Sequence, residues 1–163
     1  MRYLFIDKIK SIECNKSITA IKNVSLSEDV FTDHFMGYPV MPGALQIETV
    51  AQVATALLEV SSDFSFKAIL SIVEKIKFRK LIRPGDQLIV KVNIITKEKR
   101  SAQLEGEIFV NDKPVMDGRF VFSLIDADQF YPVKTKALIE SVYDFWLEGA
   151  ELTGFAKTKG AKL

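Results

Sequence analysis

The segment from Leu45 to Val60 most constrains the fold, because its apolar side chains cover nearly every side of a helix with 3.6 residues per turn. Such a helix must be buried, so the rest of the chain has to wrap around it. Each large side chain removed from water contributes about 1.5–3 kcal/mol, which makes this segment the centre of the expected core.

One polar line interrupts this helix at helical spacing: Glu48, Gln52, Thr55 and Glu59. These side chains need a cleft, a partner or hydrogen bonds. Glu48 is the unusual one, because a carboxylate near the start of a buried helix is unfavourable by several kcal/mol unless it is paired, neutralised or solvated.

Strand patterns flank the helix on both sides. Residues 3–13 and 17–24 precede it, and residues 68–80, 87–96, 101–110 and 115–125 follow it, the last two as a hairpin through 111–113. This order predicts an α+β fold in which a mostly antiparallel sheet curls around one central helix.

The strand expected at 68–80 has one apolar and one basic face. Its two-residue period predicts that Ile72, Ile76 and Phe78 face the core. The opposite face carries Lys75, Lys77 and Arg79. This basic face is either an ordinary solvated face or a docking surface for an acidic partner.

A chain of 163 residues with 48% hydrophobic content suffices for one core. We expect a domain at 1–126 and a C-terminal extension at 127–163, with an amphipathic helix at 135–147 and a loose polar tail at 157–163. In that helix, Tyr143, Phe145 and Trp146 are expected to cover a sheet face or a subunit seam.

Composition argues against several classes of protein. A net charge of +1 disfavours a general nucleic-acid binder. The single cysteine, Cys14, excludes an intrachain disulfide framework and a cysteine-rich metal site. Charges interrupt residues 1–13 and long apolar runs are missing, so we expect no signal peptide, no membrane insertion and a cytoplasmic location. We attribute the ending Ala161-Lys162-Leu163, a weak peroxisomal address, to chance.

The only histidine lies in a turn-rich segment directly before the helix. This segment, His34-Phe35-Met36-Gly37-Tyr38-Pro39-Val40-Met41-Pro42-Gly43, followed by Leu45, Glu48, Ala51 and Gln52, resembles the signature of FabZ-type 3-hydroxyacyl-[acyl-carrier-protein] dehydratases. A second block of that family is similar to Lys77-Phe78-Arg79 and Pro84-Gly85-Asp86-Gln87-Leu88. The resemblance covers most of residues 1–125 and implies a hotdog fold, in which a curved antiparallel sheet wraps a long central helix.

The resemblance also implies a site that removes water from a 3-hydroxyacyl thioester. His34 would be the base at C2, Glu48 would handle the C3 hydroxyl, and the backbone amide of Gly43 would polarise the thioester carbonyl. Gln52 would support them by hydrogen bonding, and no metal or organic cofactor is called for. The residues suit these roles, since an imidazole titrates near ~6.5, apolar neighbours favour a protonated Glu48, and glycine leaves an amide open at a helix N-terminus.

The implied partner is an acyl carrier protein bearing a phosphopantetheine-linked 3-hydroxyacyl chain. The family further implies a homodimer, often assembled into a trimer of dimers, whose active sites take the histidine from one subunit and the acidic residue from the other. Docking of the acidic carrier would use the basic residues Lys75, Lys77, Arg79, Lys80 and Arg83, with Lys97, Lys99 and Arg100 as further candidates.

Three positions depart from the family pattern and leave rate and chain preference open. Asp33 stands where glycine is common, Met36 where proline is usual, and Tyr38 where a basic or other polar residue is more frequent. Three alternatives therefore stay open: a dehydratase that also isomerises its product, a hotdog thioesterase, and a non-catalytic binding or assembly subunit. The isomerising group commonly has aspartate at the position of Glu48, and the presence of both His34 and Glu48 argues against the last alternative.

Overall fold

The computed structural model describes residues 3–130 and 133–155. Its elements are β1 (Lys8–Glu13), β2 (Ser17–Asn23), the 3-10 helix η1 (Asp29–Thr32), α1 (Gly43–Ser61), β3 (Phe66–Phe78), β4 (Gln87–Lys97), β5 (Ser101–Val110), β6 (Lys113–Asp126), α2 (Ala127–Phe130), α3 (Val133–Leu147) and β7 (Glu151–Thr153). The central helix, the later strands and the C-terminal helix confirm the sequence predictions. The tail predicted at 157–163 lies outside the described residues.

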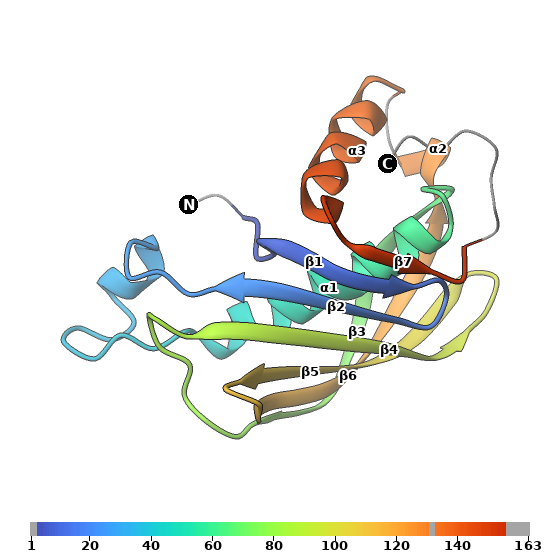
Figure 1. Ribbon diagram of the computed structural model, residues 1–163. Helices are drawn as coiled ribbons and strands as arrows, with labels where there is room; N and C mark the ends of the chain where they lie inside the picture. The colour runs from blue at the N-terminus through green and yellow to red at the C-terminus, as the bar shows by residue number, and fades with distance from the viewer. Residues whose placement is uncertain (1–2, 131–132, 156–163) are drawn as a thin grey trace.

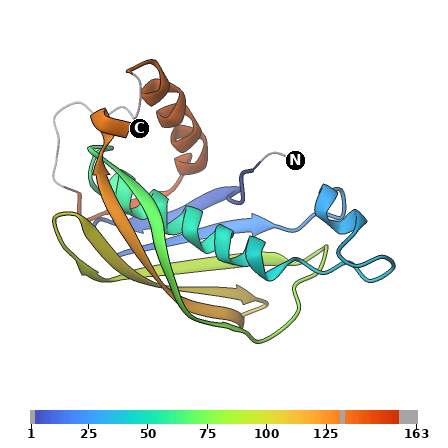
Figure 2. The same ribbon diagram turned by 180° about the vertical axis from the view of Figure 1, so that it is seen from behind.

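The strands form one curved sheet in the order β3-β6-β5-β4-β2-β1-β7. Neighbouring strands are antiparallel except β1 and β7, which pair in parallel. Figures 1 and 2 show the sheet curling around α1, with the loop between η1 and α1 projecting beyond the N-terminal end of the helix. The predicted α+β arrangement is therefore confirmed.

Helix α1 contributes the densest part of the core. Val50, Val53 and Leu57 have no exposed surface and pack toward apolar residues of the sheet. The sheet approaches the helix so closely at Gly106 that an added β-carbon would collide with Val50. Glycine is thus required in β5 by close packing.

Strand β1 is shorter than the sequence predicted. The segment 3–13 has strand character in the sequence, but the strand begins only at Lys8. Upstream, the amide of Phe5 donates to Oε1 of Gln52 at 2.8 Å, and the carbonyl of Tyr3 accepts from Nε2 of the same side chain at 3.3 Å. A side chain of α1 therefore replaces a neighbouring strand as the hydrogen-bonding partner of residues 3–5.

Two irregularities in β3 change which of its side chains face the core. Its register against β6 shifts between Leu70 and Ile72 and again between Glu74 and Lys77. Residues opposite each other in antiparallel strands share a face, so Val73, opposite buried Phe120, faces inward and Ile72 faces outward. The prediction for Ile72 was wrong because each bulge reverses the alternation.

The inward direction predicted for Phe78 and Ile76 agrees with their contacts. Phe78 lies opposite buried Met116, and its ring packs against Gly43. Ile76 lies against Gly118 of β6. At the end of β3, after the second bulge, the side chains therefore alternate between the two faces as the sequence predicted.

The C-terminal helix α3 packs across β1 and over one side of α1 (Figures 1 and 2). Tyr143 and Trp146 are buried, whereas Phe145 is exposed. Two of the three aromatic residues are thus buried on the inner side of α3, which covers part of the sheet at β1, as predicted, and also contacts α1 through Tyr143. Strand β7 was not predicted, because three residues are too few to show an alternating pattern.

Candidate active site

The His34 side chain is held at the start of the loop that leads into α1. Its Nδ1 lies 2.7 Å from the carbonyl oxygen of Val40, and the backbone amide of Val40 donates to the carbonyl of His34 at 2.9 Å. The ring of Phe35 stacks on the imidazole with 4.2 Å between centroids. These contacts fix both the position and the plane of the imidazole.

The contact with Val40 also fixes the tautomer of the neutral ring. A carbonyl oxygen can only accept a hydrogen bond, so Nδ1 must carry the proton. The lone pair then lies on Nε2, on the opposite side of the ring. His34 is thereby arranged to take up a proton at Nε2.

Gly43 is the first residue of α1, directly after the N-cap residue Pro42. The first amides of a helix have no partner within the helix, and they lie at the positive end of its dipole. A β-carbon at Gly43 would stand 2.8 Å from Cζ of Phe78. Glycine therefore allows Phe78 to pack against the start of the helix. Because glycine has no side chain, nothing of residue 43 itself covers its backbone amide.

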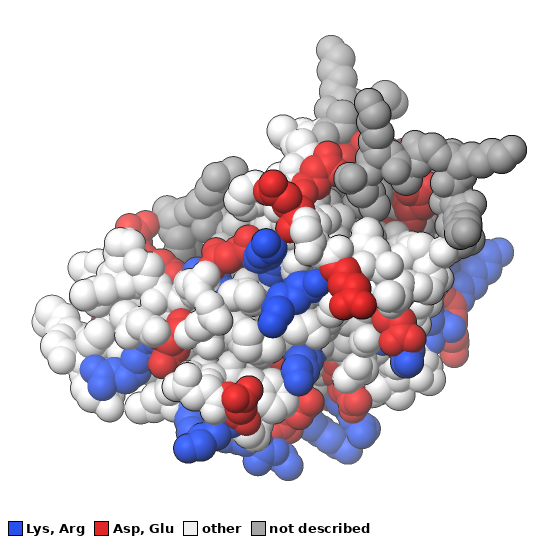
Figure 3. Space-filling model, in the orientation of Figure 1, with Lys and Arg blue, Asp and Glu red and all other residues white. Residues whose placement is uncertain are grey.

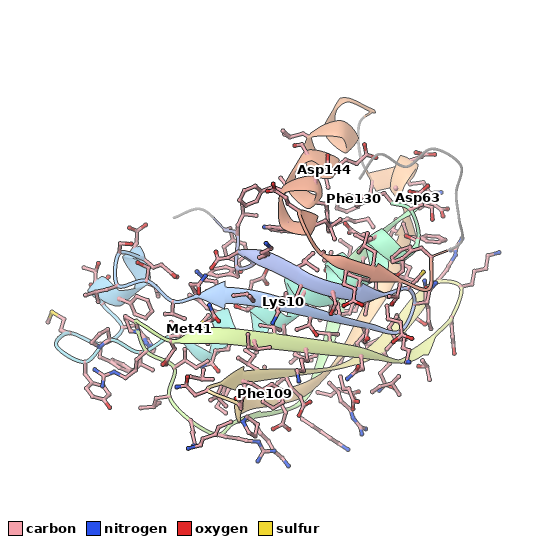
Figure 4. The ribbon with its side chains drawn as sticks, in the orientation of Figure 1. Lys10, Met41, Asp63, Phe109, Phe130 and Asp144 are labelled. Carbon is pink, nitrogen blue, oxygen red and sulfur yellow. The ribbon has the colours of Figure 1, made fainter. Side chains whose placement is uncertain are left out.

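Glu48 lies about 7 Å along the α1 axis from Gly43, as five residues of helical rise require. Figure 4 marks the two ends of this helix through Met41, just before it, and Asp63, just after it. The side-chain amide of Gln52, one turn further, donates to Oε1 of Glu48 at 2.9 Å. Gln52 thus supports Glu48 through a hydrogen bond and also binds residues 3–5.

Tyr3 is a third member of this cluster that the sequence did not indicate. Partial burial, the negative charge of Glu48 and a hydrogen bond with that carboxylate raise the pKa of Tyr3 above its usual 10.0. The N-terminal segment folds back onto α1 through the Gln52 contacts, and this brings the phenol to Glu48. Tyrosine at position 3 carries no motif that could have revealed the contact.

Glu48 and Gln52 line a pocket of about 310 Å³ between α1, the first residues of β3 and α3. Its other lining residues are Leu4, Thr55, Lys67, Ala68, Ile139, Val142, Tyr143 and Trp146. The volume lies at the lower end of the range for small-molecule sites. Glu48, Gln52 and Thr55 of the polar line therefore face a cavity, one of the three expected solutions, whereas Glu59 is buried with partners.

The basic docking candidates fall into two groups. Lys75, Lys77 and Arg79 line an open groove of about 570 Å³ on the outer face of β3, β6 and β5. The other charged residues that line it are Arg119 and the carboxylates Glu105, Glu107 and Asp117. Arg79 pairs directly with Asp117 at 2.5 Å. Figure 3 likewise shows acidic and basic side chains interspersed along the lower margin of the face it presents.

Lys80 and Arg83 follow β3, in a segment that lies beside the start of α1. The amide of Met41 donates to the carbonyl of Ile82 at 2.8 Å, and the guanidinium of Arg83 lies 4.4 Å from the centre of the Tyr38 ring. A cation over an aromatic face is an attractive contact. Arg83 is thereby joined to the loop that carries His34, through a residue that departs from the family pattern.

Two further observations concern metals and membranes. Among residues 3–130 and 133–155, no group of three or more His, Cys, Asp or Glu side chains could hold a metal ion. No helix in the same part of the chain is long and apolar enough to cross a membrane.

The fold and the motifs together identify the class of protein. The hot-dog-like protein from Thermanaerovibrio acidaminovorans superposes with a TM-score of 0.60 over 78% of this chain and 91% of that one, at 19% identity. A hypothetical thioesterase from Streptococcus pneumoniae, solved with coenzyme A, gives 0.59 over 73% and 85%, at 12% identity. Both show that the predicted hotdog fold is correct.

Residues 1–119 match the family model of the FabA-like domain, and the chain belongs to this family. It is 42% identical over 120 residues to the 3-hydroxyacyl-[acyl-carrier-protein] dehydratase FabZ of Pediococcus pentosaceus, which covers 73% of this chain and 80% of the relative. For the enzyme of the same name from Clostridioides difficile, the identity is 33% over 125 residues, with 76% and 88% covered. Within the family the chain is of the FabZ type.

Proposed function

We propose that this protein removes water from (3R)-3-hydroxyacyl-[acyl-carrier-protein] and forms the trans-2-enoyl thioester, in fatty acid or related lipid biosynthesis. The observation that carries the proposal is the state of His34, whose Nδ1 is engaged by Val40 and whose Nε2 is available as a base. It stands in the same sequence block as Glu48.

The reaction uses three groups of this chain. Nε2 of His34 takes the proton from C2, the C2–H electron pair forms the double bond to C3, and the C3–O bond breaks. Glu48, in its protonated form, gives its proton to the departing hydroxyl, which leaves as water. The amide of Gly43 donates to the thioester oxygen while negative charge develops on it.

The direct test compares the protein with His34→Ala and Glu48→Gln on a 3-hydroxyacyl thioester, with products identified by mass spectrometry. Removal of a general acid or base lowers the rate by about 100- to 10,000-fold, so we expect almost no enoyl product from either variant. Gln103→Ala, on β5, is the control and should keep full activity. Release of free acid by the unchanged protein would show a thioesterase instead, and no reaction would show a non-catalytic subunit.

We propose further that two copies of the chain share each site. β3 is the last strand at one end of the sheet order, and its apolar residues Ile72, Val73 and Phe78 are 51%, 41% and 51% exposed. Exposed apolar edge strands tend to pair with another chain, and a C2 pair of β3 strands would cover these residues. The exposed side chains of Phe35 and Met36, at 57% and 87%, place a second apolar surface on the His34 loop.

Complementation distinguishes a shared site from a site within one chain. When His34→Ala and Glu48→Gln proteins exchange subunits, half of the dimers are mixed, and each mixed dimer contains one intact site only if the two residues come from different chains. We therefore expect about one quarter of the wild-type rate after exchange. A mixture that stays inactive although exchange is shown by mass would mean that each chain builds its own site.

We infer that an acidic acyl carrier protein delivers the substrate in the cytoplasm and docks on the basic side chains Lys75, Lys77, Arg79, Lys80 and Arg83. Within this set, Lys80 and Arg83 have the stronger support, because three carboxylates in the outer groove offset most of the positive charge of Lys75, Lys77, Arg79 and the neighbouring Arg119. Lys80→Glu should raise the KM for carrier-bound substrate several-fold and leave a small pantetheine thioester unaffected. Lys77→Glu should have a smaller effect, and equal losses on both substrates would argue against docking.

A further inference from the structure

The pocket between α1 and α3 is formed by a part of the chain that lies beyond the matched family domain. The family match ends at residue 119, whereas four of the pocket-lining residues come from α3. These four, Ile139, Val142, Tyr143 and Trp146, are spaced so that they share one face of the helix. The extension therefore adds a wall to the polar line of α1.

This wall is firmly attached at one end. The Tyr143 hydroxyl donates to Oε2 of Glu59 at 2.7 Å, and Glu59 is only 2% exposed. Lys67 forms an ion pair with Oε1 of the same carboxylate at 2.7 Å. Glu59 lies one turn beyond Thr55 on α1, so Tyr143 closes the end of the pocket that is farthest from Glu48.

The pocket has the dimensions and surface of a site for a hydrocarbon chain. Its lining runs about 10 Å along α1 from Glu48 to Thr55 and faces mostly apolar side chains of α3. The volume of about 310 Å³ accommodates roughly ten groups of the size of a water molecule. Among the described lining residues, Lys67 alone carries an ammonium group, and Glu59 neutralises it.

We propose that this pocket receives the hydrocarbon end of the acyl chain and that α3, anchored through Tyr143, limits the chain length that the enzyme accepts. The inference rests on the proposed function, because it places the reacting carbons beside Glu48. From there the chain extends along Gln52 and Thr55 toward Tyr143. Chains that reach Tyr143 exclude water from the apolar wall, and longer ones meet the closed end.

The chain carries its own reporter for this pocket, because Trp146 is the only tryptophan in the sequence and lines the cavity. Saturated acyl-pantetheine thioesters without a 3-hydroxyl group cannot lose water, so they report binding alone. A dodecanoyl thioester should change the Trp146 emission, and a butyryl thioester, too short to reach α3, should not. An unchanged emission at concentrations of the dodecanoyl thioester that saturate the protein would overturn the proposal.

Two substitutions, one that fills the pocket and one that enlarges it, test the limit on chain length in turnover. Val142→Phe fills the pocket and should reduce kcat/KM for long 3-hydroxyacyl thioesters by about fourfold for each methylene that no longer fits, with short chains unaffected. Ile139→Ala enlarges it and should shift the preference to longer chains. Leu138 lies on the same helix but is 68% exposed, so Leu138→Phe is the matched control and should leave the chain-length profile unchanged.

The outcomes separate this inference from the proposed function. If the unchanged protein dehydrates 3-hydroxyacyl thioesters but Val142→Phe keeps the same chain-length profile, the pocket does not hold the chain and the function stands. If no thioester is dehydrated while the emission responds to dodecanoyl and not to butyryl thioester, the pocket holds acyl chains and the dehydratase assignment fails. The Val142→Phe protein should also lose the emission response, which a merely structural role of α3 would not predict.

Discussion

The buried ion pair between Glu59 and Lys67 provides the sharpest test of how α1 is held in the fold. The Glu59 side chain is 2% exposed and the Lys67 side chain 18% exposed. Removing one partner of such a pair leaves an uncompensated buried charge and typically lowers the free energy of unfolding by about 3–5 kcal/mol. In Lys67→Met, Glu59 keeps the hydroxyl of Tyr143 and the amide of Ala68 as donors, so we expect the lower end of that range.

The measurement is thermal unfolding at one fixed protein concentration, since association of subunits shifts the midpoint. For a chain of this size each kcal/mol corresponds to about 2–4 °C, so a loss of about 3 kcal/mol predicts a Tm lower by about 6–12 °C. Lys16→Met is the matched control. Its pair with Glu13 is just as short, at 2.8 Å, but the lysine is 68% exposed, and the expected loss is below about 1 kcal/mol.

A second substitution shows whether the charge of Glu59 causes the loss. Glu59→Gln removes the charge and keeps one oxygen, which can accept from the amide of Ala68, while its NH2 group can donate to the Tyr143 hydroxyl, which also accepts hydrogen bonds. In the Lys67→Met background it should therefore restore much of the lost stability, which appears as a coupling energy in a double-mutant cycle. If Lys67→Met lost no more than Lys16→Met, or if the two substitutions were additive, the argument from buried charge would be refuted.

Two further predictions concern Gly106 and Tyr3. Gly106→Ala should lower the free energy of unfolding by about 1–3 kcal/mol, because its β-carbon collides with Val50, and denaturant titration measures this loss. The raised pKa of Tyr3 means that its contribution to stability is complete below the unfolded value of about 10 and is lost as the pH rises through the higher folded value. Glu48→Gln should lower that pKa, and spectrophotometric titration against Tyr3→Phe would detect it; an unchanged titration would exclude the contact.

Much of the fold could be predicted from the sequence, because the spacing of apolar residues distinguishes a helix, with a period of 3.6 residues, from a strand, with a period of two. An all-round apolar helix must be enclosed, and the alternation in β4 matches its buried residues Leu88, Val90 and Val92. The bulges in β3 could not be predicted, because they arise from pairing with β6, and they moved Ile72 to the outer face. Local patterns carry no information on such pairing.

The site could be predicted only in part, for the same reason. The block from His34 to Gln52 is continuous in sequence, so its candidate residues could be named from its resemblance to the FabZ-type signature. The side chain of Gln52 donates to the carbonyl of Tyr3 across 49 residues and so holds Tyr3 near Glu48. The Tyr143 hydroxyl donates to Glu59 across 84 residues. Contacts of that sequence separation leave no local signal, and they are also what closes the pocket.

The polar line of α1 places two carboxyl groups about 16 Å apart in opposite surroundings. Glu59 meets the cation of Lys67, so its charge is stabilised and it can hold α3 in place. The described donors to Glu48 are neutral, the amide of Gln52 and the hydroxyl of Tyr3, and this carboxyl group has the proposed role of acid in the reaction. Glu59→Gln should therefore change stability and chain preference with little effect on the turnover of short substrates, whereas Glu48→Gln should abolish turnover at nearly unchanged Tm. The reverse result would mean that the two carboxyl groups have been assigned to the wrong roles.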